Sequence, residues 1–201
     1  PGIPGDAVDL AVPIGEAPLS PTPGAPRSAA VETIAKRVAD LVPDGATFQA
    51  GSGDPPAAVA SALRLHRGLR VHSGIITQEY QQLAESGALD AGFEHIAGVA
   101  WGDATFRNWL PQSGFVFRSV FETHGHQELA AIPGFVSLGS ALEVDLAGNL
   151  NLEWRSGRRV SSVGGAPDYL RAAAASPGGR AIIALQAASK SGGSRIVPSL
   201  K

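Results

Sequence analysis

The chain of 201 residues contains neither cysteine nor methionine, and only 6% of its residues are aromatic. The absence of cysteine excludes disulfides, thiolate metal sites and a cysteine nucleophile. It is also compatible with the cytoplasm, which we take as the expected location. Because the chain begins at Pro1 and lacks methionine throughout, we expect it to be part of a longer chain.

Charged residues are also few, at 17% of the chain, and the formal net charge is −2. No basic stripe indicates nucleic-acid binding, and no acidic block indicates disorder. No apolar run approaches the roughly 18 residues that cross a membrane. We therefore expect neither nucleic acid nor a membrane as a partner. The length suffices for one domain with a sizeable core, with or without a tail.

The first 27 residues are rich in proline and glycine, as in PGIPG and PLSPTPGAP. Proline restricts φ and removes a backbone donor, so such a segment favours an extended chain over a helix or a strand. We predict an arm or linker over residues 1–27 and one folded domain over residues 28–201.

From Ser28 onwards, helix-like and strand-like segments alternate. Ser28 caps a predicted helix that ends by Pro43-Asp44-Gly45. The other expected helices span 55–66, 77–86 and 168–175. The expected strands span 46–49, 69–72, 95–99, 115–120, 135–138, 150–154 and 181–185. This alternation predicts an α/β fold, an open three-layer α/β/α domain with a mostly parallel sheet.

Loops that follow parallel strands gather at one edge of a sheet, where ligands bind. Three glycine-containing turns could meet at this edge: Gly51-Ser52-Gly53, His72-Ser73-Gly74 and Gly164-Gly165. Glycine in a turn often serves only a positive φ, so a purely structural role stays open for each of them.

Five segments, in order along the chain, resemble the acetyl-CoA hydrolase/transferase family, which includes acetate and 4-hydroxybutyrate CoA-transferases. They read GATFQAGSGDPPAAVASAL, LRVHSG, SALEVDLAGNLNLE, SSVGGAPDYLRAAAASPGGRAIIAL and SRIVPSL. The first four are similar to the family patterns GATLQxGIGxxPxAV, LGxHSE, SAxEVDLxGQVNxE and SGVGGQxDFxRGAxxSxGGxxIIAL. The resemblance covers about residues 30–200. It implies a CoA-transferase-like carboxyl-terminal domain that works with an amino-terminal half-domain or a partner subunit.

The resemblance also implies a ping-pong reaction on an acyl-CoA or acyl-carrier thioester. A glutamate of the family attacks the thioester to give a mixed anhydride, and CoA returns to form a glutamyl-CoA thioester. Backbone N–H groups stabilise the oxyanion. The matching positions here are Ala50 or Gly51, in the turn that ends at Gly53, and Gly164 or Gly165. Coenzyme A is then a substrate or ligand, and we expect no tightly bound cofactor and no metal.

The chain departs from the family pattern at Gly74, which aligns with the glutamate of the HSE motif. Glycine has no carboxylate, so covalent CoA transfer is expected to be lost or altered, unless another residue carries it. Glu143, in the EVD segment, is a candidate carboxylate, although we favour a structural role for it. The pKa of histidine would suit His72 to general base work, but orienting the turn is the favoured role.

His124 and His126 alternate in THGHQE as paired metal ligands do, but no third ligand stands at a recognisable spacing. We therefore favour a loop or surface role for both. Three functions stay open. The first is a thioester-processing enzyme, transferase or hydrolase, with altered chemistry. The second is a noncatalytic domain that binds CoA or an acyl carrier within a larger assembly. The third is a CoA-transferase whose glutamate was removed by substitution.

Overall fold

The computed structural model describes residues 4–12, 27–189 and 191–200. Within these ranges, no helix combines the length and the apolar character that crossing a membrane requires. The first described segment contains a short 3₁₀ turn, η1 (Gly5–Ala7), and is exposed to solvent. Residues 13–26, most of the predicted arm, lie outside the described residues.

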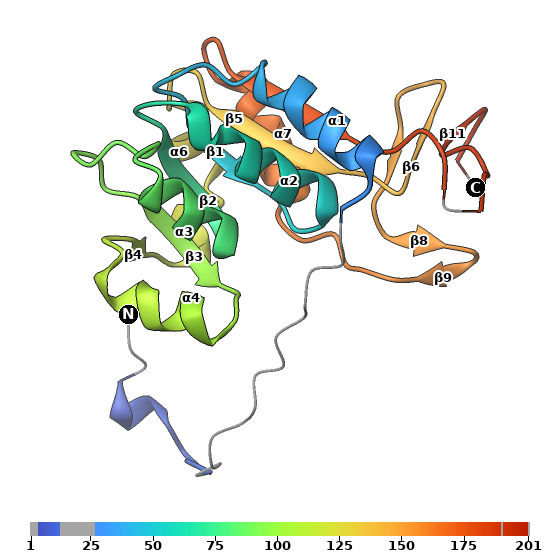
Figure 1. Cartoon of the computed structure of the whole chain (residues 1–201). Coiled ribbons are helices and arrows are strands. Elements are labelled where there is room, and N and C mark those ends of the chain that lie inside the picture. Colours follow the sequence, from blue (N-terminus) through green and yellow to red (C-terminus); the bar gives the residue numbers. More distant parts are fainter. Residues whose placement is uncertain (1–3, 13–26, 190, 201) are drawn as a thin grey trace.

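A six-stranded sheet forms the centre of the domain, and every pair of neighbouring strands in it is parallel (Figure 1). The spatial order is β10-β5-β1-β2-β3-β4. The strands are β1 (Thr47–Ala50), β2 (Arg70–Ile76), β3 (Ile96–Ala100), β4 (Val116–Phe117), β5 (Val136–Ser140) and β10 (Arg180–Ala184). The parallel sheet predicted from the alternation of helices and strands is confirmed.

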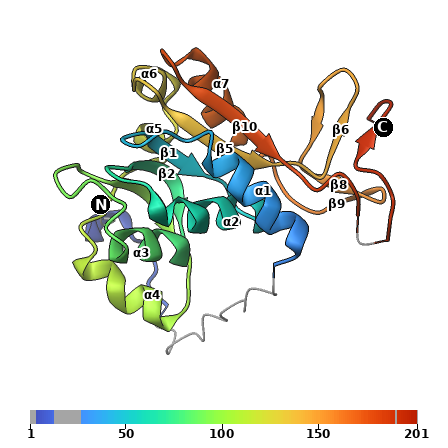
Figure 2. The same ribbon diagram turned by 45° about the horizontal axis from the view of Figure 1, so that its top comes forward.

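Helices cover both faces of this sheet, as the two views show (Figures 1 and 2). One layer consists of α1 (Ala29–Ala39), α2 (Asp54–Ala62) and α3 (Gln78–Glu85), which pack in succession, with α4 (Ala104–Trp109) beside α3. The other layer consists of α5 (Val120–Thr123) against β2 and β3, and α7 (Ala166–Ala175) against β5 and β10. In that layer, α6 (His126–Ala130) packs on α7. The three-layer α/β/α arrangement is therefore also confirmed.

Local chemistry explains where several elements begin. The Ser28 hydroxyl accepts a hydrogen bond from the Val31 N–H at 3.3 Å and caps α1 as predicted. The strand predicted over 115–120 is wrong in its second half. Ser119 and Glu122 form a capping box there, which starts α5 and leaves β4 only two residues long.

The segment after β5 builds two small sheets at the edge of the domain. In one of them, β6 (Glu143–Asp145) pairs with β7 (Leu150–Asn151) and β11 (Ile196–Val197). In the other, β8 (Trp154–Arg155) and β9 (Arg158–Arg159) form a hairpin. The single strand predicted over 150–154 is therefore wrong. The Asn151 side-chain oxygen accepts hydrogen bonds from the Glu153 and Trp154 N–H groups and turns the chain between β7 and β8.

The main hydrophobic core lies between the sheet and the α1–α3 layer. Its largest fully buried side chains include Phe48, Tyr80, Leu63 and Leu83. A second, smaller cluster around Phe135 joins β5 to α6 and α7. The strand order reverses at β1, because β2, β3 and β4 follow on one side and β5 and β10 on the other. Open parallel sheets bind their ligands beyond the carboxyl ends of the strands at such a reversal.

Candidate active site

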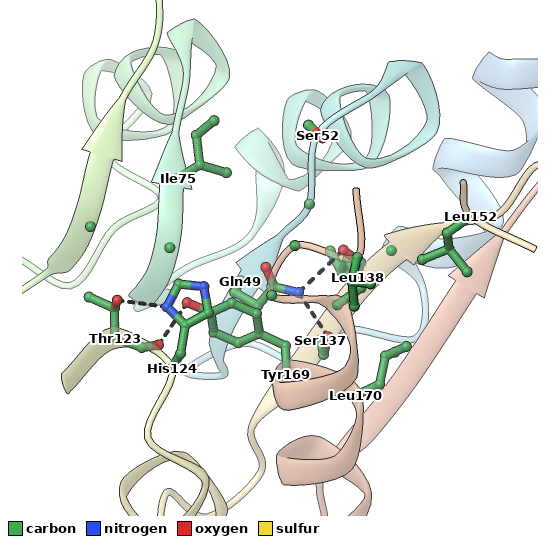
Figure 3. A pocket seen from close by; sticks show the side chains of 18 of the residues that line it. Gln49, Ser52, Ile75, Thr123, His124, Ser137, Leu138, Leu152, Tyr169 and Leu170 are labelled. Atoms are coloured by element: carbon green, nitrogen blue, oxygen red, sulfur yellow. Dashed lines mark hydrogen bonds between the residues drawn. The ribbon is translucent and has the colours of Figure 1, made fainter. Parts of the chain in front are cut away.

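A cavity of about 650 Å³ lies at this reversal, on the face of the sheet that α5 and α7 cover (Figure 3). Gln49 and the turn after β1 form one side, and residues 137–140 of β5 lie beside them. The opposite wall comes from α5, α7 and the loop 161–165. Two of the three predicted glycine turns, together with Gly74, therefore border the same cavity.

Four glycines form the floor of the cavity. The registers of β5, β1, β2 and β3 bring Gly139, Gly51, Gly74 and Gly98 to one level across the sheet. All four line the cavity, and we refer to them as the glycine row. Since a glycine adds no side chain, the strands themselves fill none of the space above this row. We infer that the row creates the space on this face of the sheet.

The imidazole of His124 and the phenol of Tyr169 occupy the place where a side chain at position 74 would stand. A Cβ built on Gly74 would lie 2.7 Å from His124 Cε1 and 2.8 Å from the Tyr169 hydroxyl oxygen, closer than real Cβ contacts. The two rings pack with centroids 4.7 Å apart, and both are seen at the centre of Figure 3. A Cβ on Gly165 would also overlap the His124 ring. The imidazole is thus held between Gly74 and Gly165.

We assign the proton of the neutral His124 ring to Nδ1 from the hydrogen bonds around it. The Nδ1 atom lies 2.9 Å from the Thr123 hydroxyl oxygen, which itself lies 3.2 Å from the Ser119 carbonyl oxygen. A hydroxyl has one hydrogen, and a carbonyl can only accept. With the Thr123 hydroxyl donating to Ser119, we assign its oxygen as the acceptor of the Nδ1–H of His124. This assignment leaves the lone pair on Nε2, for which no hydrogen-bond partner is found among the described residues.

Electrostatics keep the His124 ring neutral. Burial lowers the pKa of its imidazole below the ordinary 6.5, and the negative charge of Asp168 acts in the opposite direction. Burial also raises the pKa of the Tyr169 phenol, so the hydroxyl stays protonated and donates to the Thr123 carbonyl at 2.7 Å. The site therefore presents a neutral imidazole beside a protonated phenol.

His72 lies next to this group but does not line the cavity. Its ring is 7% exposed, and its Nε2 atom lies 3.2 Å from the Glu122 carbonyl oxygen. Burial lowers its pKa, while the Glu122 carbonyl acts in the opposite direction. The geometry suits the orienting role favoured for His72, because the bond ties β2 to the segment that carries Thr123 and His124.

The predicted oxyanion donors differ in how free their N–H groups are. Ala50 donates to the Tyr80 hydroxyl at 2.9 Å, and Gly51 donates to the Leu138 carbonyl at 2.8 Å. An oxyanion at either amide would have to compete with these bonds. For Gly164 and Gly165, no acceptor is found within the part of the chain that the structure describes. Within the described residues, no competing hydrogen bond engages these two amides.

The remaining predicted residues lie outside the cavity lining. Gly53 has a φ of +109° and starts α2, so its position requires glycine for the turn. Glu143 accepts a hydrogen bond from the Asn151 amide at 2.8 Å in the small sheet. His126 is exposed at the start of α6. No cluster of three metal-ligating side chains occurs among residues 4–12, 27–189 and 191–200.

Reasoning from the sequence missed Tyr169 and Thr123 and underrated His124. Tyr169 follows the predicted Gly164-Gly165 turn by one helical turn, at the start of a helix that was predicted, so its place near the turn could have been inferred. The position of Thr123 and His124 depends on how α5 crosses β2 and β3, which no local pattern encodes.

An open parallel α/β sheet with a cavity at its strand reversal is the arrangement in which folds of this class bind their ligands. Residues 102–201 match the model of a family described as the acetyl-CoA hydrolase/transferase C-terminal domain. The chain belongs to this family.

Relatives and solved structures agree with this assignment. The chain is 30% identical over 186 residues to a succinyl-CoA:acetate/propanoyl-CoA:succinate CoA transferase of Fasciola hepatica, covering 88% of this chain and 39% of that protein. It is 30% identical over 177 residues to a 4-hydroxybutyrate coenzyme A transferase of Clostridium kluyveri, covering 84% of this chain and 41% of that protein. The chain therefore spans about two fifths of the length of these relatives.

Among solved structures, RipA from Yersinia pestis superimposes with a TM-score of 0.85 at 29% identity, covering 92% of this chain and 44% of that chain. A 4-hydroxybutyrate CoA-transferase from Porphyromonas gingivalis superimposes with a TM-score of 0.76 at 27% identity, covering 87% of this chain and 44% of that chain.

Proposed function

We propose that this domain processes acyl-CoA or acyl-carrier thioesters in the cavity beside Gly74, without covalent CoA transfer through residue 74. His124 and Tyr169 occupy the place that a side chain at position 74 would take, and this observation carries the proposal. The membership of the family supports a thioester substrate. The missing side chain argues against a carboxylate nucleophile at this point of the sheet.

The proposal also rests on the side chains that line the cavity. The described residues that line the cavity include neither aspartate nor glutamate. Glu143, the alternative considered from the sequence, accepts a hydrogen bond from Asn151 in the small sheet instead. A mixed anhydride needs a carboxylate in contact with the thioester carbonyl. The chemistry of this domain therefore proceeds without an acyl-enzyme anhydride on its own residues.

The proposed binding mode follows from the polar groups around the cavity. The thioester lies over the glycine row, and its carbonyl oxygen points to the free amides of Gly164 and Gly165. Arg118 is the one cation among the described lining residues, although it also forms ion pairs with Glu94 and Glu122. In this proposal, coenzyme A is a substrate, and the rest of the ligand contacts lie on a second half-domain or subunit.

A noncatalytic CoA-binding domain is the second candidate. The same cavity and the absence of a carboxylate in its lining favour it, because both fit binding without reaction. A transferase that lost its glutamate by substitution is the third. It would require His124 and Tyr169 to stand elsewhere in the parent, since they occupy the place of a Cβ at position 74.

The experiment that tests the proposal uses the full-length protein with acetyl-CoA and butyryl-CoA. We expect saturable binding by calorimetry and release of free thiol above the rate of a heat-denatured sample. After incubation with acyl-CoA, hydroxylamine or borohydride should trap no glutamyl thioester. Binding without thiol release would establish the noncatalytic candidate. A trapped glutamyl thioester on this domain, or no binding of either thioester, would overturn the proposal.

A further inference from the structure

His124 carries the one imidazole among the described residues that line the cavity. Thr123 accepts the Nδ1 proton, and the ring is wedged between Gly74 and Gly165. The ring of His72, on β2, lies within hydrogen-bond distance of the carbonyl of Glu122, two residues before His124. A histidine oriented in this way by a second group is the arrangement that general bases use.

We propose that His124 is the general base of a hydrolytic reaction, in which water takes the place of a carboxylate nucleophile at position 74. The inference rests on the proposed function, because it assumes that an acyl thioester binds over the glycine row. It adds a reaction type, thioester hydrolysis, and it predicts that no acceptor acid is needed.

The step balances with the groups at hand. A water molecule held by Nε2 attacks the thioester carbonyl carbon, and Nε2 takes one proton from it as the new C–O bond forms. The oxyanion of the tetrahedral intermediate receives hydrogen bonds from the Gly164 and Gly165 amides. The C–S bond then breaks, the CoA sulfur leaves with the electron pair, and the imidazolium returns the proton to that sulfur. The products are a carboxylic acid and free CoA thiol.

The Thr123 hydroxyl completes the arrangement. In this assignment it accepts from Nδ1–H at 2.9 Å and donates a hydrogen bond to the Ser119 carbonyl oxygen at 3.2 Å. Thr123 is fully buried, and its bond to His124 is partly buried at the edge of the cavity. Since the hydroxyl is uncharged, it orients the ring without the stabilisation of the imidazolium that a carboxylate would give. Thr123 is therefore a positioning residue.

Several titratable groups act on the charge state of His124. Asp168 and Tyr169 face it from α7, and His72 lies on β2, with Glu122 and Glu128 acting on His72 from α5 and α6. Burial outweighs the charge of Asp168 and lowers the pKa of His124 below 6.5. Protonation of the His124 ring removes the general base. The rate of hydrolysis should therefore fall as the pH decreases, with an inflection below pH 6.5.

A role in packing alone is the competing explanation, because the ring packs against Tyr169 with an angle of 51° between the planes. The two explanations differ in what they predict for a variant that keeps the shape. His124→Gln introduces a side chain of similar size whose amide nitrogen is not basic. His126→Gln, two residues away and exposed, is the matched control.

The test measures thiol release from acetyl-CoA by the full-length protein and its variants, with acyl-CoA affinity and melting temperature recorded for each. We expect His124→Gln to lose about 100-fold or more in kcat, within the range of general base catalysis, with an unchanged Kd and no remaining acid limb. His126→Gln should match the wild type. Added imidazole should restore part of the rate of His124→Ala.

The outcomes separate this inference from the proposed function. A folded His124→Gln variant that hydrolyses acetyl-CoA within threefold of the wild type overturns the role of His124 and leaves thioester processing standing. A wild-type rate with no acid limb down to the lowest pH at which the protein stays folded does the same without any variant, should His124→Gln fail to fold. If the wild type binds acyl-CoA but does not hydrolyse it, both the role of His124 as a general base and the proposed thioester processing are overturned.

Discussion

The hydroxyl oxygen of Tyr80 lies 2.9 Å from the amide nitrogen of Ala50 and accepts its hydrogen bond at the end of β1. The Tyr80 ring stacks on Phe48 with centroids 5.7 Å apart and an angle of 2° between the planes. This contact joins α3 to β1 immediately before the turn that borders the cavity. The position of that turn therefore depends on a phenol that is almost completely buried.

The buried phenol of Tyr80 should make the free energy of unfolding depend on pH in the alkaline range. Burial raises the pKa of Tyr80 to about 12, so the folded chain keeps a proton that the unfolded chain releases near pH 10. The unfolded state then binds fewer protons, and stability falls as pH rises from 10 to 12, by about 2–3 kcal/mol from this group. Urea unfolding followed by circular dichroism should show a shallower loss for Tyr80→Phe. Equal slopes in both proteins would contradict the assignment.

Acid stability should depend on His95. Its Nδ1 accepts from the Val71 N–H at 3.2 Å, and its Nε2 lies 3.1 Å from the Asp90 carbonyl, so the ring is neutral. Burial lowers its pKa below 6.5, against the effect of the Asp90 carbonyl. The unfolded chain therefore takes up a proton first, and stability decreases as pH falls below 6.5. His95→Gln should have lower stability at pH 7 by about 1–3 kcal/mol and a flatter acid limb. An unchanged acid limb would argue against His95.

The glycine row should not tolerate a methyl group at its β3 end. A Cβ on Gly98 would lie 2.7 Å from the Gly74 carbonyl oxygen and 3.3 Å from the Thr123 hydroxyl oxygen. The first neighbour is main chain and cannot rotate away, so Gly98→Ala should cost about 1–3 kcal/mol of unfolding free energy. Gly5→Ala, with no atom within 4 Å of the new Cβ, is the matched control. Similar midpoints in chemical denaturation for the two variants would refute the close approach.

Restoring a glutamate at position 74 should fail on its own. Gly74→Glu places a side chain where His124 and Tyr169 stand, so we expect a lower melting temperature and no trapped glutamyl thioester. The double variant Gly74→Glu/His124→Ala opens the space and should recover stability relative to Gly74→Glu. A stable Gly74→Glu protein with full CoA-transferase activity would show that the two rings move aside easily.

Local patterns predicted the scaffold well, because its signals are local. Ser28 as a cap, prolines at the start of α2, and apolar runs between glycine turns each specify an element through its own residues. The error at 115–120 has a local cause as well, since the capping box at Ser119 is a helix signal that competes with the strand pattern.

The candidate site could be predicted only in part. The alignment of Gly74 with a family motif predicts that it lies at the candidate site, but its neighbours there come from distant segments of the chain. His124 stands 50 residues later in the chain, and Tyr169 stands 95 residues later. Their approach follows from how α5 and α7 pack on the sheet, which is a property of tertiary structure.

The glycine row has a consequence for how the cavity accommodates a guest. A surface made of side chains adapts by changing rotamers and loses conformational entropy when it is fixed against a ligand. Gly139, Gly51, Gly74 and Gly98 have no rotamers to select, and the neighbouring parallel strands hold their peptide planes. The glycine row therefore adds no side-chain rearrangement when a ligand binds. Differences in acyl-chain preference among variants should originate in the walls formed by α5, α7 and the loop 161–165.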